Sequence, residues 1–342
     1  MFETIWFVLW GLLWAVYFVL DGFDFGLGIL MPALAKNDDE RRIMYNAAGP
    51  YWDGNEVWLI TAGGVTFAAF PKAYAVMFSA LYAPLLVLLF ALIFRAVSYE
   101  FRNKIDDPRW RKGWDTCQFL GNFLPALLLG VAFANLFIGI PVDGDGVYHG
   151  NLLKLLNLYG LAGGIFFVFI FAMHGSLWLA LKTDGSLRER GIATAKVLWP
   201  VVVILAILFL AMTAKYTNLY DNYCAHPSLL LLPIVAVAAL IVARAMLAGD
   251  NLVGAWICSA VFIIMVTFFG VVGMFPGIII SSIDPAFSIT AFNGASSAMT
   301  LKIMLGVTCV FIPIVILYQA WVYYTFSHKV TEESLKNDSH AY

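Results

Sequence analysis

Residues 5–31 read IWFVLWGLLWAVYFVLDGFDFGLGILM, an apolar run whose only charged residues are Asp21 and Asp24. A membrane-spanning helix needs roughly 20 apolar residues, at about 1.5 Å each, to cross about 30 Å of hydrocarbon. This run is long enough and predicts a first span close to the N-terminus. It has no positively charged beginning and no small-residue cleavage site, so we interpret it as a retained span and not as a signal peptide.

The rest of the chain has the same character. Of its 342 residues, 62% are hydrophobic and 12% are charged, whereas soluble domains contain about half apolar and about a quarter charged residues. The net charge of −2 gives no indication of nucleic-acid binding. We therefore predict an all-α integral membrane protein, one transmembrane domain over 1–342, surrounded by the lipid bilayer. Nine spans are predicted, at about 5–31, 55–71, 73–97, 116–139, 157–181, 193–213, 228–247, 253–275 and 301–326.

The distribution of basic residues predicts the orientation. If successive loops alternate between the two sides, 16 of the 20 lysines and arginines fall on one side. The positive-inside rule makes that side cytoplasmic. The N-terminus is then expected outside, and a tail over 327–342 is expected in the cytoplasm. The segment 276–300 contains no Lys or Arg and is expected to lie along the outer surface.

The two acids of the first span need an explanation. Asp21 and Asp24 are three residues apart, so they share a helix face. About 16 apolar residues, or about 24 Å of helix, precede Asp21, which places both carboxylates in the inner part of the bilayer. A helix end with two snorkelling acids is one reading, but aspartate is short and the sequence continues apolar. Acids at such depth mark ion or proton pathways, and Gly22, Gly26 and Gly28 allow another helix to approach closely.

The second span opens with YWDGNEVWLITAGG, residues 51–64. One interpretation is a capping box, in which Asp53 is the N-cap and Glu56 its partner three residues later. The other places Asp53 near the cytoplasmic membrane face, at a depth similar to that of Asp21 and Asp24. Asn55 adds a donor and an acceptor that can hold water. Both readings stay open on sequence alone.

Arg95 ends the third predicted span, after about 21 apolar residues. A single arginine there is often a snorkelling anchor. The alternative is that Arg95 balances Asp21, Asp24 or Asp53. Three acids and one arginine, drawn from three helices at one depth, would form a polar cluster on the cytoplasmic side that can relay protons.

The histidines argue against a haem ligand set in this chain. His149 and His226 fall in predicted outer loops, and His328 and His340 in the inner tail, so only His174 lies within a span. A bis-histidine haem site needs two suitably placed side chains. We therefore interpret His174 as a hydrogen-bonded interior residue. The four cysteines show no metal-binding spacing.

Several segments together resemble subunit II of the cytochrome bd quinol oxidases, and the resemblance covers essentially the whole chain. The most specific of them is the WDGNEVWLITAGG stretch. The matching segments are DGFDFGLG (21–28), ERRIM (40–44), WDGNEVWLITAGGVTFAAFP (52–71), FRAVSYEFRNK (94–104), RWRKGWD (109–115), MFP (274–276) and LYQAW (317–321).

This resemblance implies an activity, cofactors and partners. Oxidases of the family oxidise a quinol and reduce dioxygen to water, and they contribute to the proton-motive force without pumping. They are heterodimers of the bacterial or archaeal inner membrane, in which subunit I ligates haems b and d and carries the quinol-binding loop. Subunit II is expected to supply no haem ligand. Some members also hold a structural quinone in subunit II or bind small accessory subunits.

The resemblance also implies a fold and a site. Two four-helix bundles plus one peripheral helix are expected. The acids of the DGFD and WDGN motifs border a cytoplasmic proton-entry route along the subunit interface in family structures, which coincides with the depth argument. The candidate proton-pathway residues are Asp21, Asp24, Asp53 and Glu56, with Trp52, Asn55 and Arg95 in support.

Two other functions are compatible with acids inside the membrane. A proton-coupled secondary transporter would also place carboxylates on its first span, but such carriers usually show paired, broken helices in two halves. Here the broken character is concentrated in the first span and after Phe275. A purely structural membrane anchor would leave the inner acids without a purpose.

Overall fold

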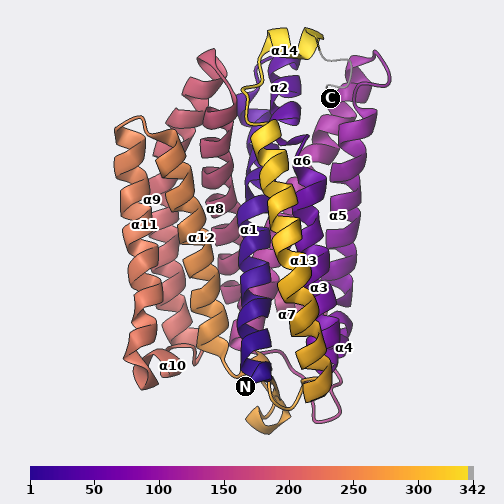
Figure 1. Ribbon diagram of the computed structural model, residues 1–342, viewed down its shortest axis with the longest axis vertical. Coiled ribbons are helices and arrows are strands. Elements are labelled where there is room, and N and C mark those ends of the chain that lie inside the picture. Colours follow the sequence, from indigo (N-terminus) through magenta and orange to yellow (C-terminus); the bar gives the residue numbers. More distant parts are fainter. Residues whose placement is uncertain (338–342) are drawn as a thin grey trace.

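The computed structural model describes residues 1–337, and within this range the chain is almost entirely helical (Figure 1). His340 and the end of the predicted tail lie outside the described residues. The α-helices are α1 (Phe2–Leu34), α2 (Asp38–Ala48), α3 (Trp52–Ala69), α4 (Pro71–Ala80), α5 (Tyr82–Phe101), α6 (Pro108–Ile138), α7 (Leu152–Leu155), α8 (Leu158–Lys182), α9 (Gly185–Tyr216), α10 (Tyr220–Ala225), α11 (Leu231–Ala248), α12 (Leu252–Met274), α13 (Ala298–Thr325) and α14 (Glu332–Asn337).

Eight helical segments of the described chain are long and apolar enough to cross a membrane. They confirm an all-α membrane protein. The second predicted span, 55–71, corresponds to α3, which has 18 residues but is not among the eight, because polar side chains occupy its first turns. The count of nine spans therefore stays a prediction.

The third predicted span, 73–97, is not one helix. The structure breaks it at Leu81 into α4 and α5. Pro84 gives the reason, because it has no N–H to donate to the carbonyl of Ala80, and proline is tolerated only in the first turn of a new helix. Pro84 lies in the first turn of α5.

The helices form two groups around α1. One group contains α1, α3, α5 and α6, and the other contains α8, α9, α11 and α12, with α1 also packed on α8 and α12. α13 lies outside both groups, and only 6% of its apolar window is buried. α6 also packs on α8 and so joins the two groups. This arrangement agrees with the expected helix-bundle fold and assigns α13 as the peripheral helix.

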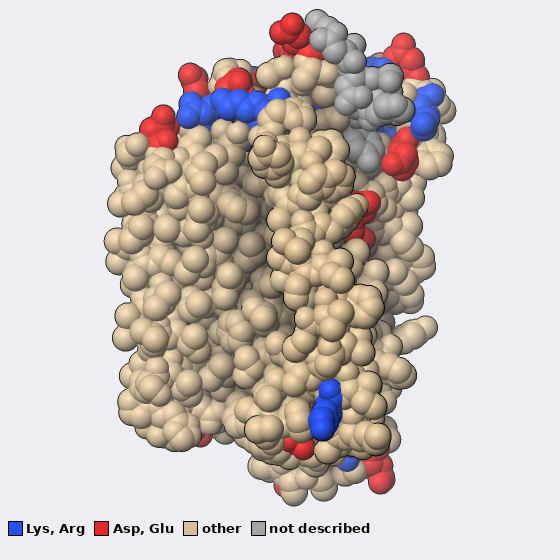
Figure 2. All heavy atoms as spheres, in the orientation of Figure 1, with Lys and Arg blue, Asp and Glu red and all other residues tan. Residues whose placement is uncertain are grey.

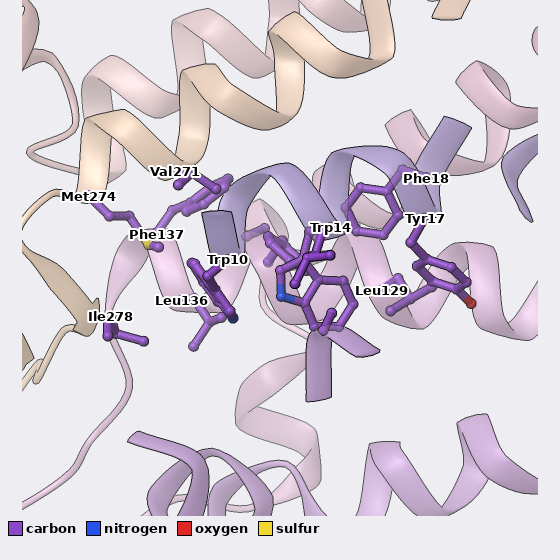
Figure 3. Packing of buried hydrophobic residues seen from close by; sticks show 14 of the residues in the cluster. Trp10, Trp14, Tyr17, Phe18, Leu129, Leu136, Phe137, Val271, Met274 and Ile278 are labelled. Carbon is purple, nitrogen blue, oxygen red and sulfur yellow. The ribbon is translucent and has the colours of Figure 1, made fainter. Parts of the chain in front are cut away.

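Aromatic side chains of α1 fill the centre of the molecule (Figure 3). Trp10 and Phe18 are almost completely buried, and the Trp14 ring meets the Phe133 ring edge-on at 5.1 Å between centroids. Because lipid tails are as apolar as these side chains, the helices are held by close packing rather than by exclusion of water.

The closest helix approach involves the glycine strip predicted in the first span. A Cβ atom added at Gly26 would lie 2.0 Å from the carbonyl oxygen of Phe171, and one added at Gly175 would lie 2.6 Å from the carbonyl carbon of Gly26. The backbones of α1 and α8 therefore touch directly at this crossing. This contact confirms that small residues let a neighbouring helix approach α1.

The segment 276–300 is compact. Its strands β1 (Gly277–Ile279) and β2 (Ile289–Thr290) pair antiparallel on either side of a short 3₁₀ helix, η2 (Pro285–Phe287). The Ser296 backbone N–H donates to the carbonyl oxygen of Ala69 at 2.9 Å. The segment lies at the same end of the molecule as the N-terminus (Figure 1).

A buried lysine fastens the chain after α13. The ammonium group of Lys182 donates to the Tyr51 hydroxyl at 3.0 Å, to the carbonyl oxygen of His328 at 2.9 Å and to that of Phe326. The Val330 N–H in turn donates to the Lys182 carbonyl at 2.7 Å. The part of the predicted tail that is described therefore returns to the ends of α3 and α8.

Changing Lys182 to Met is expected to loosen this attachment. It removes three donated hydrogen bonds and leaves the His328 carbonyl without the lysine donor, while the Phe326 carbonyl keeps the Tyr51 hydroxyl, at a cost of about 1–3 kcal/mol. Trypsin should then cleave after Lys329 faster than in the parent protein, while Lys196→Met, which removes an exposed lysine, should leave the cleavage rate unchanged. Equal rates in both variants would contradict the attachment.

Candidate functional site

The centre of the site is the buried guanidinium group of Arg95 on α5. It binds the Asp21 carboxylate with both terminal nitrogens, Nη1 to Oδ1 at 2.8 Å and Nη2 to Oδ2 at 3.2 Å. Nη2 also donates to the carboxylate of Glu56, and the group lies 4.8 Å from the centre of the Phe25 ring. Bidentate, charge-assisted pairs of this kind are strong and fix geometry. Arg95 is thus an internal partner of two acids and not a snorkelling anchor.

The second part of the site joins α1 to α3. The Asn55 side-chain Nδ2 donates to Asp24 Oδ2 at 2.7 Å and to the Leu20 carbonyl oxygen at 3.0 Å. The other carboxylate oxygen of Asp24 is buried and accepts no hydrogen bond from the described residues. Asp21 and Asp24 therefore lie side by side as predicted, each bound to a different helix.

Asp53 does not join this cluster, and the prediction that it meets Asp21 and Asp24 is wrong. Its side chain is exposed, and among the described residues its one hydrogen bond is accepted from the N–H of Gly54, at 2.7 Å. The reason is rotation about the axis of α3, because Asp53 precedes Asn55 by two residues and so points roughly 200° away from it. Counting residues gives depth in the membrane but not direction.

The capping-box interpretation is also wrong. α3 begins at Trp52 with Tyr51 as N-cap, and no side chain caps it. Glu56 points instead to Arg95, and 22% of its side chain is exposed.

The Trp52 ring stacks on Tyr99 of α5, with 5.2 Å between centroids and 3° between planes. Acidic atoms reach the surface of the otherwise largely uncharged flank beside α13 (Figure 2).

Two contributors from α13 were not predicted. Gln319 Nε2 and the Tyr323 hydroxyl both donate to Asn55 Oδ1, at 3.1 and 2.9 Å. Trp58 Nε1 donates to Gln319 Oε1 at 2.7 Å. The only sequence signal was that a glutamine and a tyrosine, four residues apart, share one face of an apolar helix.

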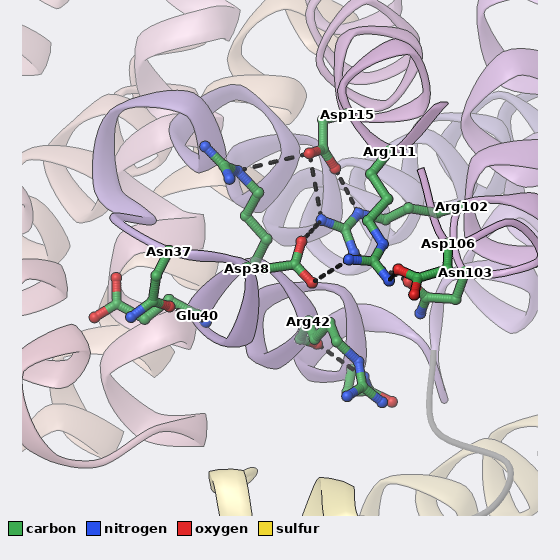
Figure 4. Close-up of polar contacts among 11 residues, drawn as sticks. Asn37, Asp38, Glu40, Arg42, Arg102, Asn103, Asp106, Arg111 and Asp115 are labelled. Carbon is green, nitrogen blue, oxygen red and sulfur yellow. Dashed lines mark hydrogen bonds and ion pairs between the residues drawn. The ribbon is translucent and has the colours of Figure 1, made fainter. Parts of the chain in front are cut away.

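A second charged cluster lies at the end of the molecule occupied by α2 (Figure 4). Arg102 is 1% exposed and pairs with Asp115 of α6 and Asp38 of α2, both at 2.6 Å. Burial would raise the pKa of the Asp38 carboxyl, but the hydrogen bond and charge of Arg102 outweigh it and hold the pKa below its usual value. The pair thus stabilises the fold at neutral pH and is lost as the pH falls through that lowered pKa.

The histidine predicted within a span is engaged in hydrogen bonds. His174 is fully buried, and both its ring nitrogens are engaged, Nδ1 with Ser259 Oγ at 2.6 Å and Nε2 with the Val19 carbonyl oxygen at 3.2 Å. This confirms the interpretation of His174 as a hydrogen-bonded interior residue. Among residues 1–337, no group of three His, Cys, Asp or Glu side chains is placed to hold a metal ion.

Comparison with known proteins gives the family. The family model described as cytochrome bd terminal oxidase subunit II matches residues 2–326. The chain belongs to this family. Subunit 2 of the cytochrome bd ubiquinol oxidase of Bacillus subtilis is 35% identical to this subunit II, over 97% of each chain. Subunit 2 of the cytochrome bd-I ubiquinol oxidase of Escherichia coli is 34% identical over 98% of this chain and 97% of its own.

The fold of this subunit II is also that of a solved oxidase. A chain from the structure of bd oxidase from Geobacillus thermodenitrificans superimposes with a TM-score of 0.78 at 16% identity, over 95% of this chain and 98% of its own. Subunit II is therefore a multi-pass protein of the bacterial cell membrane and part of a terminal oxidase. The family description, subunit II of a cytochrome bd terminal oxidase, implies a subunit I partner.

Proposed function

We propose that this chain is the haem-free subunit of a quinol:oxygen oxidoreductase, that it stabilises the haem-bearing subunit I, and that it lines a proton-entry path. The observation that carries the proposal is the group of three acids Glu56, Asp21 and Asp24, in which Arg95 binds the first two and Asn55 binds the third. Glu56 reaches the protein surface, whereas Arg95 and Asp21 are fully buried. Charged groups linked in this way from surface to interior suit the uptake of protons.

The basic residues support an entry from the cytoplasm. On the face shown in Figure 2, Lys and Arg gather mainly at the end where α2 and α14 lie, above a flank that is nearly free of charge. By the positive-inside rule this end faces the cytoplasm. The N-terminus then lies outside, the 327–342 tail lies inside, and the buried acids lie in the inner half of the membrane.

The chemistry of the oxidase requires such a path. Reduction of one dioxygen to water consumes four protons, and a haem site within the membrane is closed to bulk water. Electron transfer and oxygen reduction belong to the haems of subunit I. Subunit II contributes carboxylates that take up protons and pass them inward. We assign Asp53, exposed on α3 beside Glu56, to the entrance, with Trp52 holding that end of α3 against α5.

A further part of the proposal concerns a structural quinone. A cavity of about 260 Å³ lies among α6, α8, α9, α11 and α12, and its lining is almost wholly apolar. Such a cavity suits an isoprenoid tail. The quinone is a smaller part of the proposal than the proton path.

Family membership favours the oxidase subunit over a proton-coupled transporter or a purely structural membrane anchor.

Asp24→Asn is the test of the proton path. The change keeps the shape of the side chain but removes its ability to bind and release a proton, so quinol-driven oxygen uptake should fall about tenfold or more, with the haem content of the purified complex unchanged. Asp106→Asn, whose side chain is 92% exposed, is the matched control and should behave as the parent. Parent-like uptake in both Asp24→Asn and Asp21→Asn would rule out the path through these acids.

A further inference from the structure

We propose that Gln319 and Tyr323 of the peripheral helix α13 are positioning residues, which hold the Asn55 amide in the one orientation that donates to Asp24. The inference rests on the proposed proton path, because it gives these two side chains a role through Asp24. Neither of them makes a described hydrogen bond to Asp24 itself, so their influence passes through Asn55.

The hydrogen bonds of Asn55 leave its amide no freedom. Its Oδ1 accepts from Gln319 and Tyr323, and its Nδ2 donates to Asp24 and to the Leu20 carbonyl. An amide oxygen has two lone pairs and an amide nitrogen two hydrogens, so all four places are used. A flipped amide would set its oxygen against the Leu20 carbonyl and the Asp24 carboxylate, and its nitrogen against the Gln319 amide nitrogen, which can only donate. In a fully buried position that arrangement would be costly.

The direction of the series is fixed at its far end by Trp58. An indole N–H can only donate, so its bond to Gln319 Oε1 turns Gln319 Nε2 towards Asn55. Asn55 must then face this nitrogen with Oδ1, so its Nδ2 faces Asp24. The series therefore ends in a donor directed at a carboxylate, a charge-assisted bond that supports the deprotonated acid.

Other contacts already attach α13 to the bundle, so the hydrogen bonds of Gln319 and Tyr323 are not needed for attachment. The helix is mostly exposed, and backbone contacts at its two ends already attach it to the bundle. Trp6 Nε1 donates to the Leu301 carbonyl oxygen at 2.9 Å, and the Tyr51 hydroxyl to that of Phe326 at 2.6 Å. Hydrogen bonds that served only to attach α13 could be made to any polar group of the bundle. Those of Gln319 and Tyr323 are both made to Asn55, which binds Asp24.

The test measures coupling between α13 and Asp24. Tyr323→Phe and Gln319→Leu are each expected to lower quinol-driven oxygen uptake about fivefold, the equivalent of one ordinary hydrogen bond, and to displace its pH profile, with haem content unchanged. Trp58→Phe should do the same without touching Asn55. In an Asp24→Asn background, each of these changes should have no additional effect. Tyr324→Phe, an exposed tyrosine of the same helix, is the control.

Three outcomes would overturn the inference. Parent-like rates and pH profiles in Tyr323→Phe and Gln319→Leu, with Asp24→Asn slow, would remove the positioning role and leave the proton path intact. Losses that multiply with that of Asp24→Asn would show that the two side chains act independently of Asp24. A parent-like rate in Asp24→Asn would overturn this inference, because the two side chains act through Asp24, and a parent-like rate in Asp21→Asn as well would overturn the proton path.

Discussion

Arg95→Met is expected to lower the free energy of unfolding of the assembled oxidase by about 3–5 kcal/mol, and to reduce the amount of complex recovered from membranes. Removing one member of a buried ion pair leaves the others uncompensated, and here two acids, Asp21 and Glu56, lose the same partner. The thermal midpoint of the purified complex and the yield of haem-containing complex measure the effect.

The effect of the unpaired carboxylates on stability can be measured separately from the effect of the lost Arg95 packing. A triple variant, Arg95→Met with Asp21→Asn and Glu56→Gln, removes both unpaired carboxylates and should recover most of the stability, although not the oxygen uptake. Lys196→Met removes an exposed basic residue and should change neither. A single Arg95→Met variant as stable as the parent would mean that the buried pairs do not hold α1, α3 and α5 together.

Gly26→Ala is expected to be the second most damaging change. The added methyl group would lie 2.0 Å from the carbonyl oxygen of Phe171 on α8. A backbone carbonyl cannot move aside by a rotamer change, as a side chain can. α1 and α8 must separate, which costs about 3 kcal/mol or more and disturbs the packing beside Asp24. The thermal midpoint should fall clearly.

The matched control for this change lies on α3. A Cβ at Gly64 would meet nothing within 4 Å, so Gly64→Ala should be neutral or slightly stabilising, since alanine favours a helix by about 1 kcal/mol over glycine. Equal stability of Gly26→Ala and Gly64→Ala would show that α1 and α8 do not cross in contact.

The sequence was informative about depth and less so about direction. Counting residues correctly placed Asp21, Asp24 and Arg95 at one level, because helix rise is constant. It wrongly included Asp53, since rotation about α3 depends on where that helix begins. Pro84 marked the break between α4 and α5 but was read as part of one span.

The contribution of α13 could not be predicted from the sequence, for a different reason. Gln319 and Tyr323 are not distinguished in the sequence from neighbours such as Tyr318 and Tyr324, and their significance comes from Asn55, which lies far away in the sequence. Only the fold brings these segments together. The same holds for the second cluster, where the sequence shows many charges around 100–115 but not that Arg102 is the buried one.

The place of α13 in the chain has a consequence for biosynthesis. Asp24 and Asn55 leave the ribosome early, whereas Gln319 and Tyr323 emerge when almost all of the polypeptide has been made. The nascent protein must therefore insert its first acids into the bilayer before their complete set of partners exists. Truncated products that end before α13 lack the two donors to Asn55 and carry an unfinished polar centre.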